Sequence, residues 1–172
     1  MGRPGKLFWI GLGVACASIL IDQGTKWWIV NVFMVPPRVV PVTSFFNLVL
    51  GWNRGVSFGL FNNGSDFNVW ILSGLALAVV TFLLVWLYRE QARLVTVSLG
   101  LVIGGAMGNV IDRLRFGGVT DFLDFHLSGY HWPAFNLADT SIVIGAVILI
   151  ADSLFAGKEK PNNRSMGRKE NE

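Results

Sequence analysis

The sequence VWILSGLALAVVTFLLVWLY, residues 69–88, contains no charged side chain. An α-helix needs about 20 apolar residues to cross the hydrocarbon core of a bilayer, because each residue adds about 1.5 Å to its length. This stretch has that length and composition and therefore predicts a transmembrane helix. The next one, LVTVSLGLVIGGAMGNVI at residues 94–111, is also free of charge and predicts a second.

Two further apolar runs are interrupted by charge near one end. The run that begins at Leu7 meets Asp22 and Lys26 and then resumes, so we expect one helix there. The uncharged run 140–151 follows Asp139 and predicts another helix. The sequence therefore predicts an all-α membrane protein with four transmembrane helices. The expected spans lie at about residues 7–30, 69–88, 94–113 and 135–156.

The first span has an alternative interpretation as a cleaved signal peptide. Lys6 belongs to a short basic start, and Ala15-Cys16-Ala17 has the small-x-small pattern of a cleavage site. A retained helix is favoured, because the apolar stretch continues past that point. Cleavage there would also leave Asp22 and Lys26 without a helix.

The composition excludes several classes of protein. Hydrophobic residues make up 52% of the 172 residues and charged residues only 15%, whereas soluble domains contain about 25% charged residues. A disordered chain and an ordinary soluble enzyme are excluded. The single cysteine, Cys16, allows neither an intramolecular disulfide nor a cysteine-based metal site.

The positions of the basic residues predict the orientation. Cytoplasmic loops are enriched in Lys and Arg, and with four spans most basic residues fall on the side that holds both termini. Both termini are therefore expected in the cytoplasm, with one domain over residues 1–156 and a polar tail over 157–172. The positive-inside rule and the attraction of the basic tail to anionic membrane lipid explain the net charge of +3, so no nucleic-acid partner is expected. The deciding residues are Arg3, Lys6, Arg89, Arg93, Lys158, Lys160, Arg164, Arg168 and Lys169.

Two segments join the spans on the opposite side. In the longer one, Pro36-Pro37 ends the first helix, and β-prone residues at about 39–61 predict a small extracytoplasmic β-sheet. Within this range we expect a strand at 56–61, and directly after it a turn at 62–65. The second segment, residues 115–133, is expected to be a loop with breaks at Gly117-Gly118 and Ser128-Gly129.

Polar residues gather where the expected spans meet these outer segments. Ionisable groups inside a span cost roughly 2.5–3.5 kcal/mol each, so they are candidates for function. The expected topology brings them to one membrane face, and we predict a shared site there. The alternative is that charges collect at span ends only because they cost least there. The residues are Asp22, Lys26, Asn109, Asp112, Arg113, Asp121, Asp124, Asn136 and Asp139.

The residue types favour acid–base chemistry. The chain has no H-E-x-x-H motif, and Asp121, Asp124, His126 and His131 lack a standard metal spacing, so no metal is expected. Ser73 lies in a span without a matching base. Two carboxyl groups close together share one proton, and one can then act as base on water while the other acts as acid.

Residue context narrows the choice of carboxyl groups without completing it. Asp112 directly precedes Arg113 and is expected to have a structural role, in an ion pair or as an anchor at the helix end. Asp139 begins a helix, where negative charge is favoured, although a helix N-cap would explain it equally. Asp121 has apolar or small neighbours, and Asp124 fits as well by composition. The residues by themselves predict Asp139 together with either Asp121 or Asp124.

Five motifs resemble those of the bacterial lipoprotein signal peptidase family, also called signal peptidase II. They are DQGTK at 22–26, NRGVSFG at 53–59, GGAMGNVIDR at 104–113, VTDF at 119–122 and FNLAD at 135–139. They follow the family's order and cover most of the chain from about residue 7 to 156. One departure is Ser57, which stands before Phe58 where the family usually has Ala.

The resemblance implies an intramembrane aspartic endopeptidase of the bacterial inner membrane, with its active site near the outer leaflet. Such an enzyme removes the signal peptide from diacylglyceryl-modified prolipoproteins by cutting before the lipidated Cys, and it needs no metal or other cofactor. We expect a monomer whose partners are lipidated prolipoprotein substrates and membrane lipid. The resemblance assigns catalysis to Asp121 and Asp139. It implies substrate-binding or site-supporting roles for Asp22, Lys26, Asn53, Gly55, Gly108, Asn109, Asp112, Arg113 and Asn136.

Two other functions use the same residues differently. A small transporter could use the outer carboxyl groups as a relay, but it would also need polar groups along the membrane depth. The mid-span positions are almost purely apolar. A non-catalytic scaffold would tolerate Asn at both Asp121 and Asp139.

Overall fold

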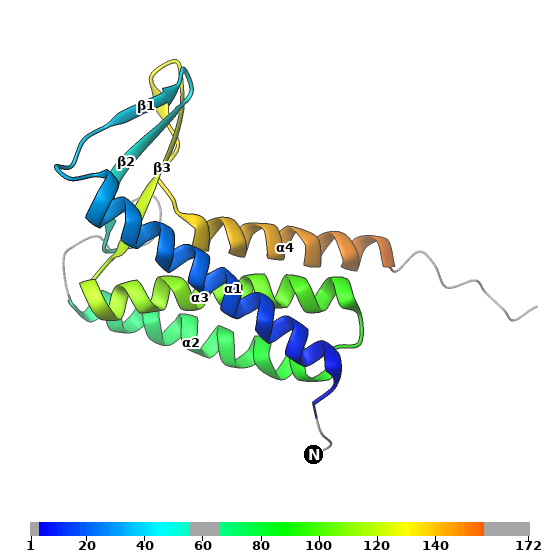
Figure 1. The fold of residues 1–172 in the computed structure, drawn as a ribbon. Helices are drawn as coiled ribbons and strands as arrows, with labels where there is room; N and C mark the ends of the chain where they lie inside the picture. The colour runs from blue at the N-terminus through cyan, green and yellow to red at the C-terminus, as the bar shows by residue number, and fades with distance from the viewer. Residues whose placement is uncertain (1–3, 56–65, 157–172) are drawn as a thin grey trace, which may run out of the picture.

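A computed structural model describes residues 4–55 and 66–156, and Figure 1 shows its helices joined to a small sheet. The described residues are mostly helical, with four long apolar helices and a four-stranded antiparallel sheet, which confirms the predicted fold class. In chain order the elements are α1 (Lys6–Trp28), its π-helical extension η1 (Ile29–Phe33), β1 (Val40–Thr43), β2 (Phe46–Asn53), α2 (Asp66–Arg89), α3 (Arg93–Phe116), β3 (Val119–Leu127), β4 (Tyr130–His131) and α4 (Leu137–Ala156).

Each of the four helices is long and apolar enough to cross a membrane. Helix α3 packs against the other three and has the most buried surface. Close packing depends on glycine: a Cβ on Gly104 would lie 2.6 Å from the Ala15 carbonyl oxygen of α1, and one on Gly145 of α4 would lie 2.6 Å from the Ser98 carbonyl oxygen of α3. Small residues let membrane helices approach in this way.

The sheet stands at one end of the helix bundle, where α1 and α3 end and α4 begins (Figure 1). Its strand order is β1-β2-β3-β4, and all neighbours are antiparallel. Buried Ile29, Met34 and Phe122 form a cluster that joins the end of α1 to the sheet. The start of α1 and the end of α4 lie at the opposite end of the bundle.

The expected loop at 115–133 is wrong, because most of it forms β3 and β4. The breaks predicted within it are confirmed. Gly117 ends α3 with a φ of 70°, and Ser128 and Gly129 form the hairpin turn between β3 and β4 with φ of 51° and 84°. The strand between them is hard to recognise because it lacks a regular burial alternation, since residues 119–122 are all buried. An alternating pattern is typical only of strands with one solvated face.

The expected sheet at 39–61 is observed in part. Strands β1 and β2 lie within it. The expected strand at 56–61, the turn at 62–65 and the substitution at Ser57 lie outside the described residues. So do Arg3 and the basic residues of the tail at 157–172.

Candidate active site

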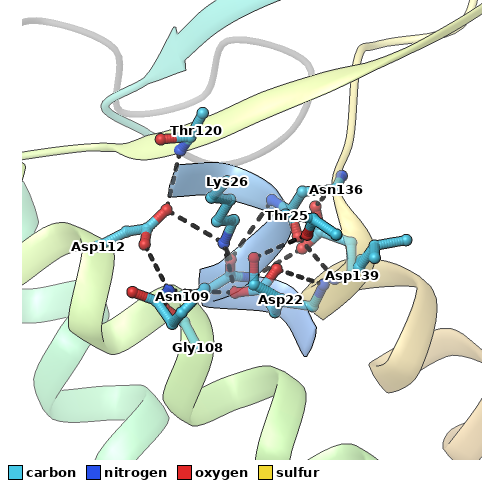
Figure 2. A network of polar contacts seen from close by, with 12 residues as sticks. Asp22, Thr25, Lys26, Gly108, Asn109, Asp112, Thr120, Asn136 and Asp139 are labelled. Atoms are coloured by element: carbon cyan, nitrogen blue, oxygen red, sulfur yellow. Dashed lines mark hydrogen bonds and ion pairs between the residues drawn. The ribbon is translucent and has the colours of Figure 1, made fainter. Parts of the chain in front are cut away.

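Three helix ends and strand β3 bring the predicted polar residues together at the sheet end of the bundle. Figure 2 shows side chains from α1, α3 and the start of α4 in one network, with β3 passing over it. Almost all of these side chains are buried. They come from segments far apart in the sequence: Asp22 and Lys26, Asn109 and Asp112, Asp121, and Asn136 and Asp139.

Lys26 occupies the centre of this network between two acids. Its Nζ lies 2.9 Å from Oδ2 of Asp22 and 3.1 Å from Oδ2 of Asp112, and it donates a hydrogen bond of 3.2 Å to Oδ1 of Asn109. Lys26 is 4% exposed, Asp22 0% and Asp112 1%. Buried charges need such partners, because an unpaired charge in the protein interior is costly.

The expected ion pair of Asp112 exists, but its partner is Lys26 rather than Arg113. The neighbouring residue on a helix points about 100° away, so Arg113 faces elsewhere. Its charge interacts most strongly with Asp139, and then with Asp121 and Asp112. The same oxygen of Asp112, Oδ2, also accepts a 3.1 Å hydrogen bond from the backbone N–H of Thr120, which ties β3 to α3.

Asp22 holds the beginning of α4. Its Oδ1 accepts a 2.9 Å hydrogen bond from the backbone N–H of Ala138, one of the first-turn N–H groups that lack a partner inside the helix. On its other side Asp22 touches α3, where a Cβ on Gly108 would lie 2.6 Å from Oδ2. A glycine at 108 therefore makes room for the carboxylate that caps the neighbouring helix.

The helix N-cap is Asn136, and Asp139 is the third residue of α4. The N–H of Asp139 donates to Oδ1 of Asn136 at 3.0 Å, and Oδ2 of Asp139 accepts from the N–H of Asn136 at 3.3 Å. This reciprocal pair is a capping box. It fixes the direction of the Asp139 side chain and corrects the interpretation of Asp139 as the N-cap itself.

Backbone pairing places Asn136 beside β3. Phe135 exchanges backbone hydrogen bonds of 2.9 and 3.0 Å with Leu123, and the N–H of Phe122 also donates to the carbonyl oxygen of Phe135. The amide of Asn136 then donates a 2.7 Å hydrogen bond to Oδ1 of Asp121. The Asn136 side chain thus bonds to the Asp121 carboxylate and to the backbone N–H of Asp139.

Two further amides complete the surroundings of these carboxyl groups. Asn109 donates to Oδ1 of Asp139 at 2.7 Å, and Asn53 donates to Oδ2 of Asp121 at 3.1 Å. The backbone N–H of Gly55 donates to Oδ1 of Asn53 at 3.1 Å and orients that amide. Burial raises the pKa of Asp121 to about 6, and the charge of Asp139 adds to this increase.

Asp124 lies outside this arrangement. Its carboxylate accepts a 2.9 Å hydrogen bond from Asn47 and pairs with Nδ1 of His131 at 2.9 Å. Burial raises its pKa, but the bonds from Asn47 and His131 outweigh that effect, and its pKa lies below the usual value. His126 stacks on His131 with ring centroids 5.0 Å apart. No group of three His, Cys, Asp or Glu side chains within residues 4–55 and 66–156 could hold a metal ion.

Sequence reasoning missed Gln23 and Asn47. The Gln23 amide donates to Oδ1 of Asp112 at 2.7 Å and to the carbonyl of Gly108 at 3.2 Å, so it joins α1 to α3. A helical wheel places Gln23 beside Lys26, three residues on, which is a usable signal. Nothing in the sequence pairs Asn47 with Asp124, because that contact depends on the register between β2 and β3.

A cavity of about 480 Å³ opens beside Asp139, between α4 and the segment that follows β4. A second cavity of about 280 Å³ lies on the other side of the network, beside Gln23, Lys26 and Asp112. The first is the space from which a substrate could reach Asp139.

Four membrane-length helices that gather carboxyl and amide side chains at one end define a multi-pass membrane protein with a candidate acid–base site. Residues 14–155 match the family model for signal peptidase (SPase) II, and the chain belongs to this family. The lipoprotein signal peptidase of Ralstonia nicotianae is 50% identical over 155 residues, which cover 89% of this chain and 87% of the relative. That of Nitrobacter hamburgensis is 46% identical over 148 residues, covering 83% and 90%. The chain is therefore an enzyme, an aspartic endopeptidase of the lipoprotein signal peptidase type.

Solved structures agree with this relationship. A bacterial membrane enzyme determined at 2.3 Å resolution superposes with a TM-score of 0.75 at 28% identity, covering 94% of this chain and 97% of that structure. A second bacterial membrane enzyme, determined at 1.9 Å, gives a TM-score of 0.74 at 27% identity, with 93% and 99% covered. The chain is a multi-pass membrane protein.

Proposed function

We propose that this enzyme removes the signal peptide from diacylglyceryl-modified prolipoproteins, and that it cuts the peptide bond before the lipidated Cys with Asp121 and Asp139. The observation that carries the catalytic assignment is the position of Asn136, whose side-chain amide donates to the Asp121 carboxylate and whose backbone N–H donates to the Asp139 carboxylate. Asp124 bonds to a different set of partners. The family relationship supports the choice of substrate.

The two carboxyl groups divide the acid and base work. Asp121, with a pKa raised to about 6, holds the proton, and the carboxylate of Asp139 takes a proton from water as that water attacks the scissile carbonyl carbon. Asp121 protonates the carbonyl oxygen. When the tetrahedral intermediate collapses, the C–N bond breaks, the proton held by Asp139 passes to the leaving nitrogen, and the hydroxyl formed from the carbonyl oxygen returns its proton to Asp121. The products are a signal peptide with a new carboxyl end and a lipidated Cys with a free amino group.

The surrounding polar residues act by position. Asn109 and Asn53 each donate to one carboxyl group and hold its direction. The Lys26 ammonium neutralises Asp22 and Asp112, which in turn fix α4 and β3 around the pair. Hydrogen-bonded groups that are already oriented need no rearrangement during the reaction.

The proposed orientation places the sheet end of the bundle at the outer surface of the inner membrane and both termini in the cytoplasm. Arg89 and Arg93, at the join between α2 and α3, lie at the other end, where the positive-inside rule favours them. The proposed scissile bond then lies where lipid meets water. The substrate reaches it sideways from the bilayer, and one chain is a complete enzyme.

The test replaces Asp121 and Asp139 by Asn, singly and together, and follows cleavage of a lipidated precursor in proteoliposomes with equal amounts of enzyme. Each single variant is expected to lose about 10²–10⁴-fold in turnover. The double variant should lose no more turnover than the less active single variant, because the effects of residues that act as a unit are not additive. Retained cleavage in both single variants would falsify the assignment, and additive losses would contradict the shared mechanism.

A further inference from the structure

The cavity beside Asp139 has one polar end and otherwise apolar walls. Trp132, Pro133 and Phe135 form one wall, and Val143 and Ile144 of α4 contribute to the other. Among the described residues that line it, Asp139 and Thr140, at the start of α4, carry the carboxyl and hydroxyl groups. Its volume of about 480 Å³ lies within the range of about 300–1,000 Å³ that is typical of small-molecule pockets.

The apolar part of this cavity continues onto an exposed face of α4. Val143, Val147, Ile150 and Leu154 are 59%, 58%, 60% and 64% exposed. Their spacing of four, three and four residues places them on one side of the helix. In a membrane-spanning helix such a face contacts lipid. The cavity therefore has Asp139 at one end and leads at the other to a surface that hydrocarbon covers.

The proposed function limits what can occupy this space, and the inference rests on that function. The substrate carries its diacylglyceryl group on the residue that directly follows the scissile bond. When the scissile carbonyl lies against Asp139, the lipid is within one side-chain length of the same point. The lipid arrives from the bilayer, whose hydrocarbon is as apolar as the cavity walls, so an acyl chain can enter the cavity without contact with water and is held by packing against those walls.

The second cavity does not suit a hydrocarbon chain. Its lining includes Gln23, Lys26, Asp112 and Arg115, and it touches neither Asp121 nor Asp139. A charged or amide-lined wall loses hydrogen bonds when hydrocarbon covers it. The cavity against α4 is therefore the better site for an acyl chain.

We infer that the cavity between α4 and the segment 132–135 holds an acyl chain of the substrate's diacylglyceryl group, and that Val143 determines which chains fit. Val143 is the lining residue whose side chain also begins the exposed face of α4. A larger side chain there narrows the passage between the polar end and the lipid. The length and bulk of the acyl chain then determine how well the substrate binds beside the scissile bond. The enzyme favours precursors whose acyl chain extends past Val143.

The test compares Val143→Trp with Val147→Trp, which lies one turn further along the same face and outside the cavity. Two precursors of one peptide sequence are used, one dipalmitoyl-modified and the other dioctanoyl-modified. For Val143→Trp, the ratio of kcat/KM for the long-chain to the short-chain precursor should fall by about 10-fold or more, mainly through KM. Val147→Trp should leave the ratio unchanged, and Val143→Phe should lower it by less.

Two results would overturn the inference. Equal losses for both precursors would mean that the cavity holds peptide rather than lipid. An effect no larger than that of Val147→Trp would mean that only bulk lipid lies there. The exposed position of Val143 favours folding of both variants, and the rate on the short-chain precursor shows that each is active. The ratio needs only an enzyme that cuts, so it is independent of the outcome at Asp121 and Asp139.

Discussion

Asp121 and Asp124 lie three residues apart on the same strand, yet they belong to different surroundings. Their side chains are 4% and 6% exposed, and each accepts a hydrogen bond from an asparagine of β2. The pKa of Asp121 is raised to about 6, whereas that of Asp124 lies below its usual value. Both carboxyl groups are thus buried and bonded to an asparagine, so the difference between their pKa values must come from their other neighbours.

The difference comes from the element that faces each carboxyl group. Asp121 meets the capped beginning of α4, which brings a second acid and the bridging amide of Asn136. Asp124 meets His131 of β4, at the hairpin. A strand can therefore present two similar acids, and the packing of a distant helix end decides which of them lies beside a second acid.

The largest expected difference is in cleavage. Asp121→Asn should lose about 10²–10⁴-fold in turnover of the lipidated precursor, because it removes the proposed acid. Asp124→Asn should keep turnover within a few-fold, because Asp124 does not contact Asp139 or Asn136. Single-turnover rates at equal enzyme concentration measure both. A loss in Asp124→Asn as large as that in Asp121→Asn would remove the distinction between the two acids.

The next difference is in stability, and it compares the cations that serve the two regions. Lys26→Met leaves Asp22 and Asp112 buried without their counter-ion and should lower the free energy of unfolding by about 3–5 kcal/mol. His131→Gln removes a partner that is 56% exposed, and exposed pairs contribute only about 0–1 kcal/mol. Unfolding in detergent measures both variants. Similar losses would show that the network around Lys26 is not a buried ion cluster.

Much of this arrangement was predictable from the sequence, because it follows from local composition. The charge-free runs predict the helices, and the polar residues at their ends predict that Asp22, Asn109 and Asp139 lie near one another. Gly117 and Ser128-Gly129 predict the turns that bound β3. Each of these signals is carried by residue type and spacing along the chain.

What could not be predicted depends on contacts between distant elements. The sequence pairs Asp112 with its neighbour Arg113, whereas helix geometry turns it toward Lys26. The choice between Asp121 and Asp124 depends on the pairing of Phe135 with β3, which brings Asn136 to one acid only. Strand β3 itself was missed because buried residues on both faces remove its alternation.

A smaller effect is expected from the amides. Asn136→Ala leaves Asp121 without its 2.7 Å hydrogen bond and α4 without its cap, and should destabilise the protein by about 1–3 kcal/mol. Turnover of the folded enzyme should also fall, because the Asn136 side chain aligns the Asp121 carboxyl group and accepts a hydrogen bond from the backbone N–H of Asp139. Asn47→Ala removes the equivalent amide from Asp124 and should reduce stability alone. Equal turnover per folded molecule in the two variants would contradict the bridging role.

The smallest effect concerns pH. As the pH rises through about 6, Asp121 loses the proton that the proposed mechanism needs, so kcat/KM should fall on the alkaline side. The Asn53 hydrogen bond lowers the pKa of Asp121 by stabilising its ionised form. Asn53→Leu should therefore move the alkaline limb of the pH profile of kcat/KM to higher pH. Asn47→Leu, its counterpart at Asp124, should leave the limb in place, and a shift of equal size there would argue against Asp121 as its source.

The most direct test of the account is the titration of Asp121 itself, followed by carbon-13 NMR of labelled aspartate carboxyl groups in the full-length enzyme. The account predicts that Asp121 titrates near pH 6, that Asp139→Asn lowers this pKa by removing a neighbouring charge, and that Asp124→Asn leaves it unchanged. An Asp121 that titrates near 3.8, or whose pKa does not respond to Asp139→Asn, would contradict the claim that these two carboxyl groups form one site.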